Sequence, residues 1–527
     1  MTVSNPSQQR VNFVRAFLSS ALATGLSRIL GAAREVSVAA FLGVGATSDA
    51  FNLAWTIPNV FRRFVADEGL TGAMIPALAS AEADGGEVEL RNLASSAFAA
   101  LTIANVVLCT LGVVFAKQLV LVFAISWRDD PEHLALAVTM TRWMFPFVGM
   151  VSTVSFYEGL LNYRGHFFTP KFAPALISLG VITAALFLGP AFSQPVYALV
   201  FGTMAGAVTH VLINVVPLAR RWGRLWLRFD FRSPRIRHIG VEMSKVIAIG
   251  LFAQINLIVL QQLATSLPAG SLTVYRNSTQ LTDLAQGIVA VGIGSALLPN
   301  ISMSVSTRSW DQFRRELAGG LRLAAFLLIP AAAVLACFGT PVTAMLFRIG
   351  KYRWEDVLLT ASALQCLAPF ILGVAGTNIV KKVYFALEDR RTLLMVGATG
   401  VGLTGTLGLV TRPWGVQGLA TALSVSTVSQ LAVYLVLLQR KLGANIALEA
   451  LIPPLLRMTV ATVPLGLTLI AFAHLGRWAN GPVDPLNWLV FGGAFATAGA
   501  VYLVASWLLG IEEVARVVSL VRRRLGR

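Results

Sequence analysis

Residues 19–43 read SSALATGLSRILGAAREVSVAAFLG, and residues 49–65 read DAFNLAWTIPNVFRRFV. Both stretches have the length and the apolar content of membrane-spanning helices, yet they contain Arg28, Arg34 and Arg62. A charge at membrane depth costs at least ~2.5 kcal/mol, so such side chains usually face a wet cavity or a polar partner. Arginine also presents a planar fork of donors that suits phosphate and carboxylate groups. The two stretches therefore predict a membrane protein with an anion-binding interior.

The composition extends this prediction to the whole chain. Of its 527 residues, 56% are hydrophobic and only 13% are charged, whereas a soluble protein is nearer a quarter charged. Apolar stretches of roughly 20 residues recur from end to end, so we predict an all-α polytopic membrane protein with about 14 transmembrane helices. The first ten residues, MTVSNPSQQR, are polar and contain no small-residue cleavage site. We therefore expect the first span to remain in place rather than to be removed as a signal peptide.

The net charge of +17 follows the positive-inside pattern of membrane proteins. Basic residues cluster at alternate connections, whereas the intervening connections, such as GVGATS, PAFSQP and SLPAGS, carry almost none. The connection at residues 219–237 mixes arginines with aromatic residues, which suits a segment lying on an anionic membrane surface. We therefore expect both termini in the cytoplasm, anionic membrane lipids as partners, and no nucleic-acid role.

A weak internal repeat divides the chain. Four sequence pairs share one separation of 223 residues: Pro76 with Pro299, Arg91 with Arg314, Pro146 with Pro369, and Thr169 with Thr392. The repeat predicts two pseudo-symmetric six-helix lobes, at residues 1–218 and 238–440, joined by the basic connection at 219–237. Residues 441–527 then hold two extra C-terminal helices and a basic tail. Transporters built from repeats place their site near mid-membrane between the halves.

One face of the second span is polar. It carries Asp49, Asn52, Thr56, Asn59 and Arg63 at spacings of three and four residues, with Arg62 beside them. A polar stripe of this length in lipid must face protein or water. The alternative interpretation is structural: hydrogen bonds between helices, an N-cap at Asp49, and arginines that reach to the interface.

Two further spans carry polar faces. In the first span Arg28 and Arg34 form a cationic wall with Glu35 as a local counter-charge, or alternatively an ion pair that locks two helices together. In the eighth span Arg276, Gln280 and Asp283 share a face, and the repeat relates this span to the second. An Arg276–Asp283 pair with a purely structural role is the alternative there.

The residues do not form a catalytic or metal motif. The three cysteines and five histidines show no ligand spacing, and no Ser/His/Asp set, paired catalytic carboxylates, nucleotide loop or HExxH motif occurs. We therefore expect neither an enzyme nor a bound cofactor or metal.

The motifs SRILGAARE, ATSDAFNLAWTIPNVFRRFVADEG and IPALA resemble the start of the MurJ/MviN-type lipid II flippases, within the superfamily of multidrug and polysaccharide exporters. The segment PFVGMVSTVSFYEGLLNYRGHFFTPKFAPAL and the motif YFALEDRRT are similar to later parts of that family. The resemblance covers most of the chain. It implies that Arg28, Arg34 and Arg62 are transport arginines, and it carries the family's acidic residue and asparagine of the second span over to Asp49 and Asn59.

The eighth span departs from the family pattern. The family's arginine there falls on Gln280, and Arg276 lies one turn earlier on the same face as its candidate substitute. Asp283 matches the family's acidic residue one turn later, and Glu35 matches its first-span aspartate. These differences affect how deep in the membrane the protein would hold a charged group of the substrate.

The resemblance implies a flippase of the bacterial inner membrane that moves lipid II, a polyprenyl-diphosphate-linked peptidoglycan precursor, by alternating access. Proteins of peptidoglycan synthesis are its implied partners. An exporter of another polyprenyl-linked saccharide or amphiphile is the alternative. A membrane enzyme would need catalytic groups at the interface, and a scaffold would tolerate replacement of Arg28 and Arg62 by alanine.

Overall fold

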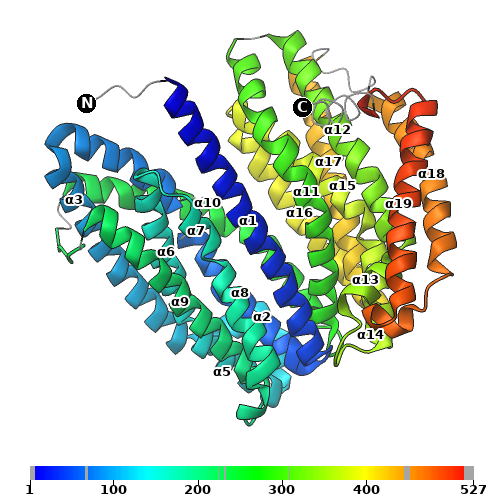
Figure 1. Cartoon of the computed structure of the whole chain (residues 1–527), viewed down its shortest axis with the longest axis horizontal. Helices are drawn as coiled ribbons and strands as arrows, with labels where there is room; N and C mark the ends of the chain where they lie inside the picture. Colours follow the sequence, from blue (N-terminus) through cyan, green and yellow to red (C-terminus); the bar gives the residue numbers. More distant parts are fainter. Residues whose placement is uncertain are drawn as a thin grey trace. The chain divides into compact units, whose positions relative to one another are not determined.

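The computed structural model describes residues 6–65, 69–223, 225–230, 233–307, 309–443 and 451–514. Within these ranges the side chains of residues 6–21, 63–65, 69–73, 245–253, 288–300, 302 and 306 are not described. Helices and short connections make up the described part, which contains no β-strand. The contacts divide the chain into two compact units, Met1–Ser266 and Leu267–Arg527 (Figure 1).

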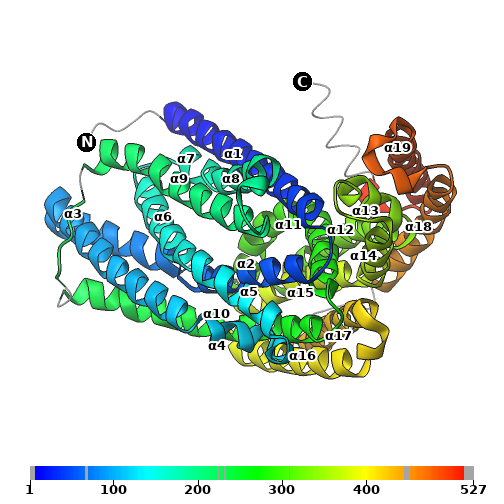
Figure 2. The same cartoon turned by 90° about the horizontal axis from the view of Figure 1, so that it is seen from below.

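The first unit contains ten α-helices. They are α1 (Pro6–Leu42), α2 (Ala46–Val65), α3 (Gly69–Val114), α4 (Ala116–Phe123), α5 (Pro131–Met144), α6 (Pro146–Tyr163), α7 (Phe168–Phe172), α8 (Ala175–Thr183), α9 (Val196–Trp222) and α10 (Pro234–Thr265). Short turns, η1 (Ile125–Asp129), the π-helical η2 (Ala184–Leu188) and η3 (Gly189–Ala191), complete this unit. Helix α1 packs against α7 and α8, and α10 runs beside α3 (Figure 2).

The second unit contains nine α-helices. They are α11 (Ser271–Ser306), α12 (Trp310–Cys337), α13 (Gly339–Phe347), α14 (Trp354–Cys366), α15 (Ala368–Ala386), α16 (Arg390–Val410), α17 (Gly415–Leu442), α18 (Ile452–Ala473) and α19 (Pro485–Leu508). Two 3-10 turns, η4 (Arg412–Trp414) and η7 (Trp478–Val483), connect them. Helix α15 packs along α17, and α18 packs against both α12 and α19.

The local sequence explains several helix boundaries. Pro131 and Pro146 occupy the first turns of α5 and α6, where a missing N–H costs nothing. Asp130 caps α5 by accepting a hydrogen bond from the His133 backbone N–H at 3.1 Å. Gly86 bends α3 with φ of 62°, a conformation that favours glycine. Gly223 ends α9 with φ of 72°.

The internal repeat is visible in the helix boundaries. The starts of α4 and α13 are 223 residues apart, as are those of α5 and α14. Pro146 and Pro369, the repeat-related prolines, both lie in the first turn of the next helix, α6 or α15. The helices α14 and α15 meet at an angle of 45°.

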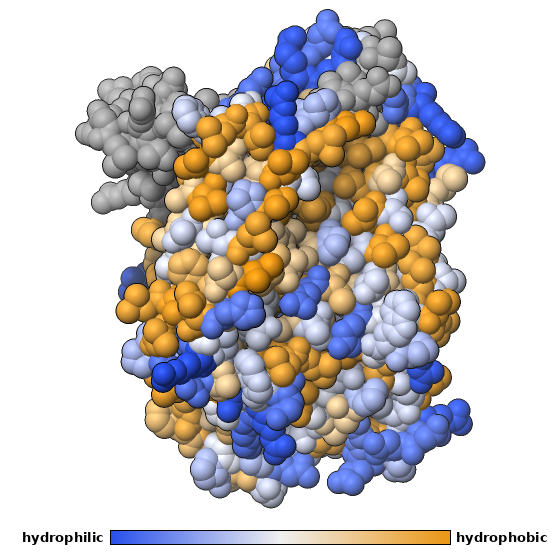
Figure 3. Space-filling view, turned by 90° about the vertical axis from the view of Figure 1, so that its right-hand side faces the viewer, coloured by the Kyte–Doolittle hydropathy of each residue, from blue (hydrophilic) through white to orange (hydrophobic). Residues whose placement is uncertain are grey.

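The helices are apolar enough to cross a membrane. Among the described residues, 9 helices meet the length and hydropathy requirements, or 10 when the bent pair α14–α15 counts as one span. Helices α1, α2, α10 and α11 have 37, 20, 32 and 36 residues and are also long enough to span a bilayer. The described part is therefore compatible with the expected count of about 14. On the face that carries α18 and α19, hydrophobic side chains gather over the middle, and hydrophilic clusters lie at the upper and lower margins (Figure 3).

The compact units differ slightly from the predicted lobes. The contact-based division follows Ser266, so α10 belongs with the first unit and packs against its α2 and α3. The predicted boundaries at residues 218, 238 and 440 describe sequence halves and extra helices, and they stay a prediction.

The helices α8 and α9 approach each other closely. A Cβ atom at Gly202 would lie 2.5 Å from the carbonyl oxygen of Gly180, and one at Gly206 would lie 2.6 Å from the Cα of Ile177. Real Cβ atoms do not approach so closely, so glycine is required along this seam. Small residues that allow such close approach are typical of helix contacts in membranes.

Candidate functional site: a cationic cavity in the first unit

A polar cavity of about 530 Å³ lies inside the first unit. Helices α1, α2, α6, α8 and α9 line it, together with Lys171 of α7. Its charged lining residues are Arg34, Arg62, Lys171 and Glu158. Three cations and one carboxylate leave the cavity with a positive balance, which suits an anionic group.

Arg34 is held by two neighbours. Its guanidinium carbon lies 4.8 Å from the centroid of the Trp55 ring, and Nη2 lies 2.5 Å from Oε1 of Glu35. The Arg34 side chain is 19% exposed and that of Glu35 is 10% exposed, so both are largely withdrawn from solvent. A cation stacked on tryptophan keeps its planar orientation while its outer donors still reach a ligand.

Arg62 is oriented by its own helix. Its Nε donates to Oδ1 of Asn59 at 3.2 Å, and Nδ2 of Asn59 donates to the Trp55 carbonyl at 2.7 Å. Trp55, Asn59 and Arg62 therefore form one chain of contacts along α2 that ends in the cavity. The spacing of polar residues along this span predicted that Asn59 and Arg62 lie close together, but it did not predict the contact with Trp55.

Several lining residues were not singled out from the sequence, among them two charged residues and a histidine. Lys171 and Glu158 form an ion pair at 2.6 Å, between α7 and α6. His210 of α9 is 4% exposed, and neither of its ring nitrogens has a hydrogen-bond partner among the described residues. Glu158 and His210 lie within apolar segments. Because a polar group is costly to bury in a membrane span, their position there could have marked them as candidate functional residues.

The other predicted residues of the first unit lie outside the cavity lining. Arg28 is exposed on α1, beside the face on which Ser27, Gly31 and Arg34 line the cavity. Asp49 is 3% exposed in the first turn of α2, ten residues before Asn59. Asn52 and Thr56 are buried, and the Thr56 hydroxyl donates to the Asn52 carbonyl at 2.8 Å. The Arg63 side chain lies outside the described residues.

The predicted residues of the eighth span lie on α11 in the second unit. Arg276 and Gln280 are half-buried, and Asp283 is exposed. Their neighbour Asn277 donates to the Tyr352 hydroxyl at 3.3 Å, which ties α11 to the connection before α14. The spacing of the three predicted residues places them on one helix face, as expected.

The second unit contains an apolar groove of about 700 Å³. It is lined by α12, α15, α17 and α18, with Leu328, Leu372, Leu435 and Leu467 among its residues. Thr459 and Thr462 are its hydroxyl-bearing residues. Such a surface suits a hydrocarbon chain.

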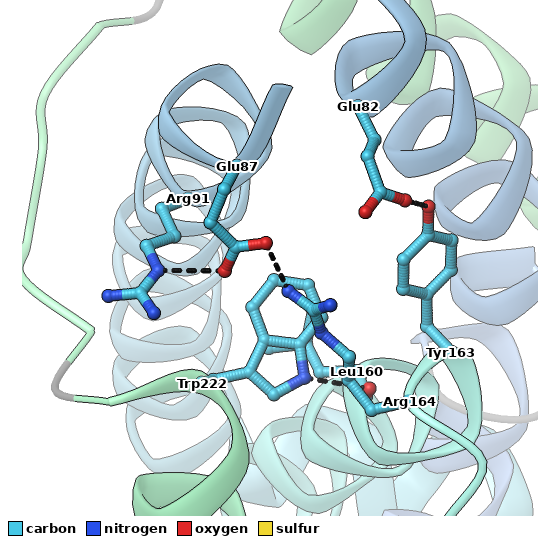
Figure 4. A network of polar contacts seen from close by, with 7 residues as sticks. All are labelled: Glu82, Glu87, Arg91, Leu160, Tyr163, Arg164 and Trp222. Atoms are coloured by element: carbon cyan, nitrogen blue, oxygen red, sulfur yellow. Dashed lines mark hydrogen bonds and ion pairs between the residues drawn. The ribbon is translucent and has the colours of Figure 1, made fainter. Parts of the chain in front are cut away.

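A separate polar network ties the bend of α3 to the ends of α6 and α9 in the first unit (Figure 4). Glu87, just after the bend of α3, accepts from Arg164 Nη2 at 2.5 Å, and the Arg164 guanidinium carbon lies 5.0 Å from the Trp222 ring centroid. The Tyr163 hydroxyl donates to the Glu82 carboxylate. The network fixes the connection that follows α6 against α3 and α9.

The fold defines a polytopic α-helical membrane protein, and its described part contains a cationic cavity and an apolar groove. A family model described as lipid II flippase MurJ matches residues 38–482. The chain belongs to the MurJ family of lipid II flippases.

Curated relatives cover nearly the whole chain. The lipid II flippase MurJ of Burkholderia cenocepacia is 29% identical over 517 residues, which are 95% of this chain and 98% of that protein. A probable lipid II flippase MurJ of Bdellovibrio bacteriovorus is 27% identical, covering 97% of each chain.

Solved structures show the same fold. A lipid II flippase MurJ in an inward closed conformation superposes with a TM-score of 0.75 at 18% identity, covering 96% of this chain and 99% of that chain. An inward-facing multidrug-resistance MATE transporter of the MOP superfamily gives a TM-score of 0.65 at 14% identity, covering 80% and 95% of the two chains.

Proposed function

We propose that this protein is a transporter that flips lipid II across the cytoplasmic membrane of a bacterium by alternating access. The observation that carries the proposal is the cationic cavity, which holds Arg34, Arg62 and Lys171 inside a unit of a MurJ-family chain. The repeat in the helix boundaries supports a mechanism in which two related halves move around a substrate site.

The cavity arginines bind the diphosphate in this proposal. Arg34 and Arg62 donate charge-assisted hydrogen bonds, which are shorter and stronger than neutral ones. Because Trp55, Glu35 and Asn59 already hold the two guanidinium groups, little side-chain entropy is lost when the anion binds.

The remaining predicted residues have supporting roles in this proposal. Arg28, at the edge of the lining face of α1, supplies a further positive charge, and Asp49 balances charge at the start of α2. On α11, Arg276 takes the part of the family's arginine, while Gln280 and Asp283 position the head group.

The apolar groove of the second unit accommodates the polyprenyl chain in this proposal. Its wall of leucines on α12, α15, α17 and α18 offers no charged group, which matches a hydrocarbon ligand. Helix α18, the first of the two C-terminal helices beyond the repeat, then has a function, because it forms one side of the groove.

The location follows from the charge pattern. The protein lies in the inner membrane with both termini in the cytoplasm, and the basic connection at 219–237 rests on anionic lipids. Proteins of peptidoglycan synthesis are its proposed partners.

The test is rescue of a bacterium depleted of its own lipid II flippase. Wild-type protein is expressed beside Arg28→Ala, Arg62→Ala and Arg276→Ala, with membrane levels measured for each. Arg142→Ala is the matched control, because Arg142 is exposed on α5 and outside the cavity. We expect wild type and the control to rescue, and the three other variants to fail at equal membrane levels.

Two other outcomes would separate the alternatives. Failure of well-expressed wild type favours an exporter of another polyprenyl-linked saccharide or amphiphile. Rescue by Arg276→Ala alone would remove Arg276 from the site and leave the cavity of the first unit as the binding region.

A further inference from the structure

A second pocket of the first unit lies at the ends of α6 and α9 and has a volume of about 570 Å³. It shares no lining residue with the cationic cavity. The connection before α7, α7 itself and the last turns of α9 form its walls. One end is basic, and the rest is apolar.

The basic end consists of His166, Arg220 and Arg221, and the described lining contains no carboxylate. Arg220 and Arg221 are exposed, so their donors are accessible. Arg221 Nη2 lies 3.5 Å from Nδ1 of His166, and Nη1 donates to the Arg164 carbonyl at a long 3.4 Å. Burial, and after it the nearby Arg221 guanidinium, lower the pKa of His166.

The apolar part consists of aromatic rings on α7 and an exposed apolar ridge on α9. The rings of Phe168 and Phe172 stack with centroids 5.9 Å apart, and Phe168 is 44% exposed. On α9 the ridge of Val216, Leu212 and Val208 continues away from the arginines, with exposed fractions of 54%, 58% and 44%. Residues four apart lie on one helix face, so the ridge is continuous.

A basic group at one end of an apolar track has the chemistry of a phospholipid site. We propose that this pocket binds an anionic phospholipid of the cytoplasmic leaflet, with its phosphate on Arg220 and Arg221 and an acyl chain along Phe168, Phe172 and the α9 ridge. The proposal rests on the cytoplasmic orientation of this end, and it is independent of which lipid is transported. It differs from general attraction by the basic connection because it requires one discrete site.

Occupancy of this pocket would position a wall of the cationic cavity. The pocket holds α7 through Phe168 and Phe172, and Lys171 on the same helix lines the cationic cavity, where it pairs with Glu158. Helix α7 also packs against α1, which carries Arg34. A bound phospholipid therefore steadies two of the cavity cations without touching them.

Native mass spectrometry of the full chain tests the site, with added phosphatidylglycerol or phosphatidylcholine. We expect one phosphatidylglycerol to be retained in preference to phosphatidylcholine. The double variant R220Q/R221Q should bind it roughly tenfold more weakly, because two charge-assisted contacts are lost. The matched control R390Q/R391Q removes the same charge from an exposed pair of arginines outside the pocket and outside the connection at 219–237, and it should bind like wild type.

A second variant, Val216→Trp, keeps every charge and fills the apolar track. It should weaken phosphatidylglycerol binding while thermal unfolding in the absence of added lipid stays near wild type. Equal loss in the two arginine double variants would overturn the proposal, as would equal retention of phosphatidylcholine. Displacement of the lipid by inorganic phosphate alone would also overturn it, since the site would then recognise a free anion. Unchanged binding in Val216→Trp would contradict the acyl track.

Discussion

At the scale of single residues, the cavity cations are restrained before any ligand arrives. Arg34 lies on Trp55, Arg62 is held by Asn59, and Lys171 is paired with Glu158. A cation–π contact, a hydrogen bond and an ion pair are different kinds of restraint. Mutations that remove them should therefore change ligand binding to different extents. In the Lys171–Glu158 pair, as in the Arg34–Glu35 pair, the ligand and a carboxylate compete for the same cation.

The pair of Lys171 and Glu158 offers a double-mutant cycle. Lys171→Ala should weaken lipid II binding by roughly two- to fivefold, because the pair is partly exposed and such interactions are worth ~1 kcal/mol or less. Glu158→Gln should tighten binding slightly, since it releases Lys171 for the anion. The affinity of the purified protein for lipid II measures both effects. If the two single changes add in the double variant, the residues do not act on the ligand together.

At the scale of helices, the structure relies on close contact in one place and on capping in another. The glycine seam brings α8 and α9 together, whereas Asp389 fixes the start of α16. The Asp389 carboxylate accepts from the Thr392 N–H at 3.1 Å and from its hydroxyl at 2.8 Å, and Lys441 lies 2.7 Å away. Capping and pairing here join the ends of α16 and α17.

Gly202→Ala should destabilise the protein. The added methyl would lie 2.5 Å from the Gly180 carbonyl and from Ala184 Cβ, and overpacking of this kind typically costs 1–3 kcal/mol. Gly397→Ala is the control, because a methyl group added there would meet no neighbouring atom within 4 Å and alanine favours a helix. We expect a lower melting temperature for the first variant in detergent and no decrease for the second. Equal melting temperatures would show that the seam can separate at little cost.

Asp389 should make stability depend on pH in the acid range. The hydrogen bond with Lys441 and the cap to Thr392 lower the pKa of Asp389 from 3.8 to about 2. The stabilisation is therefore complete above pH 3.8 and is lost as the pH falls toward 2. Asp389→Asn should melt at a lower temperature than wild type at neutral pH, and this difference should shrink on acidification. A difference that stays constant down to the lower pKa would contradict the assignment.

At the scale of the whole molecule, the sequence predicted the helical membrane fold and part of the candidate site. Asn59, Arg62 and Arg34 were recognisable because polar residues at helical spacing are costly in a span. Glu158, Lys171 and His210 come from three other helices, and their convergence depends on how α6, α7 and α9 pack. A single sequence shows which residues share a helix face, but it does not show which faces meet.

The predicted topology can be checked with single cysteines. In a background without Cys109, Cys337 and Cys366, we expect Ser193→Cys to react with a membrane-impermeant maleimide in intact spheroplasts. Arg390→Cys should react only after permeabilisation, because basic connections remain on the cytoplasmic side. Both positions are exposed in the structure, so burial does not limit their reaction. Retained rescue activity is the control for correct insertion, and labelling of both from outside would contradict the orientation.

The glycine seam between α8 and α9 has a consequence for how such proteins diversify. The glycines let α8 and α9 approach closely because they have no side chains. His210 and Ser178 line the cavity from the same two helices, but their hydrogen-bonding groups do not hold the helices together. Mutations that alter recognition at those positions can therefore accumulate without separating the pair. Libraries for directed evolution would do best to randomise the lining and leave Gly180, Gly202 and Gly206 unchanged.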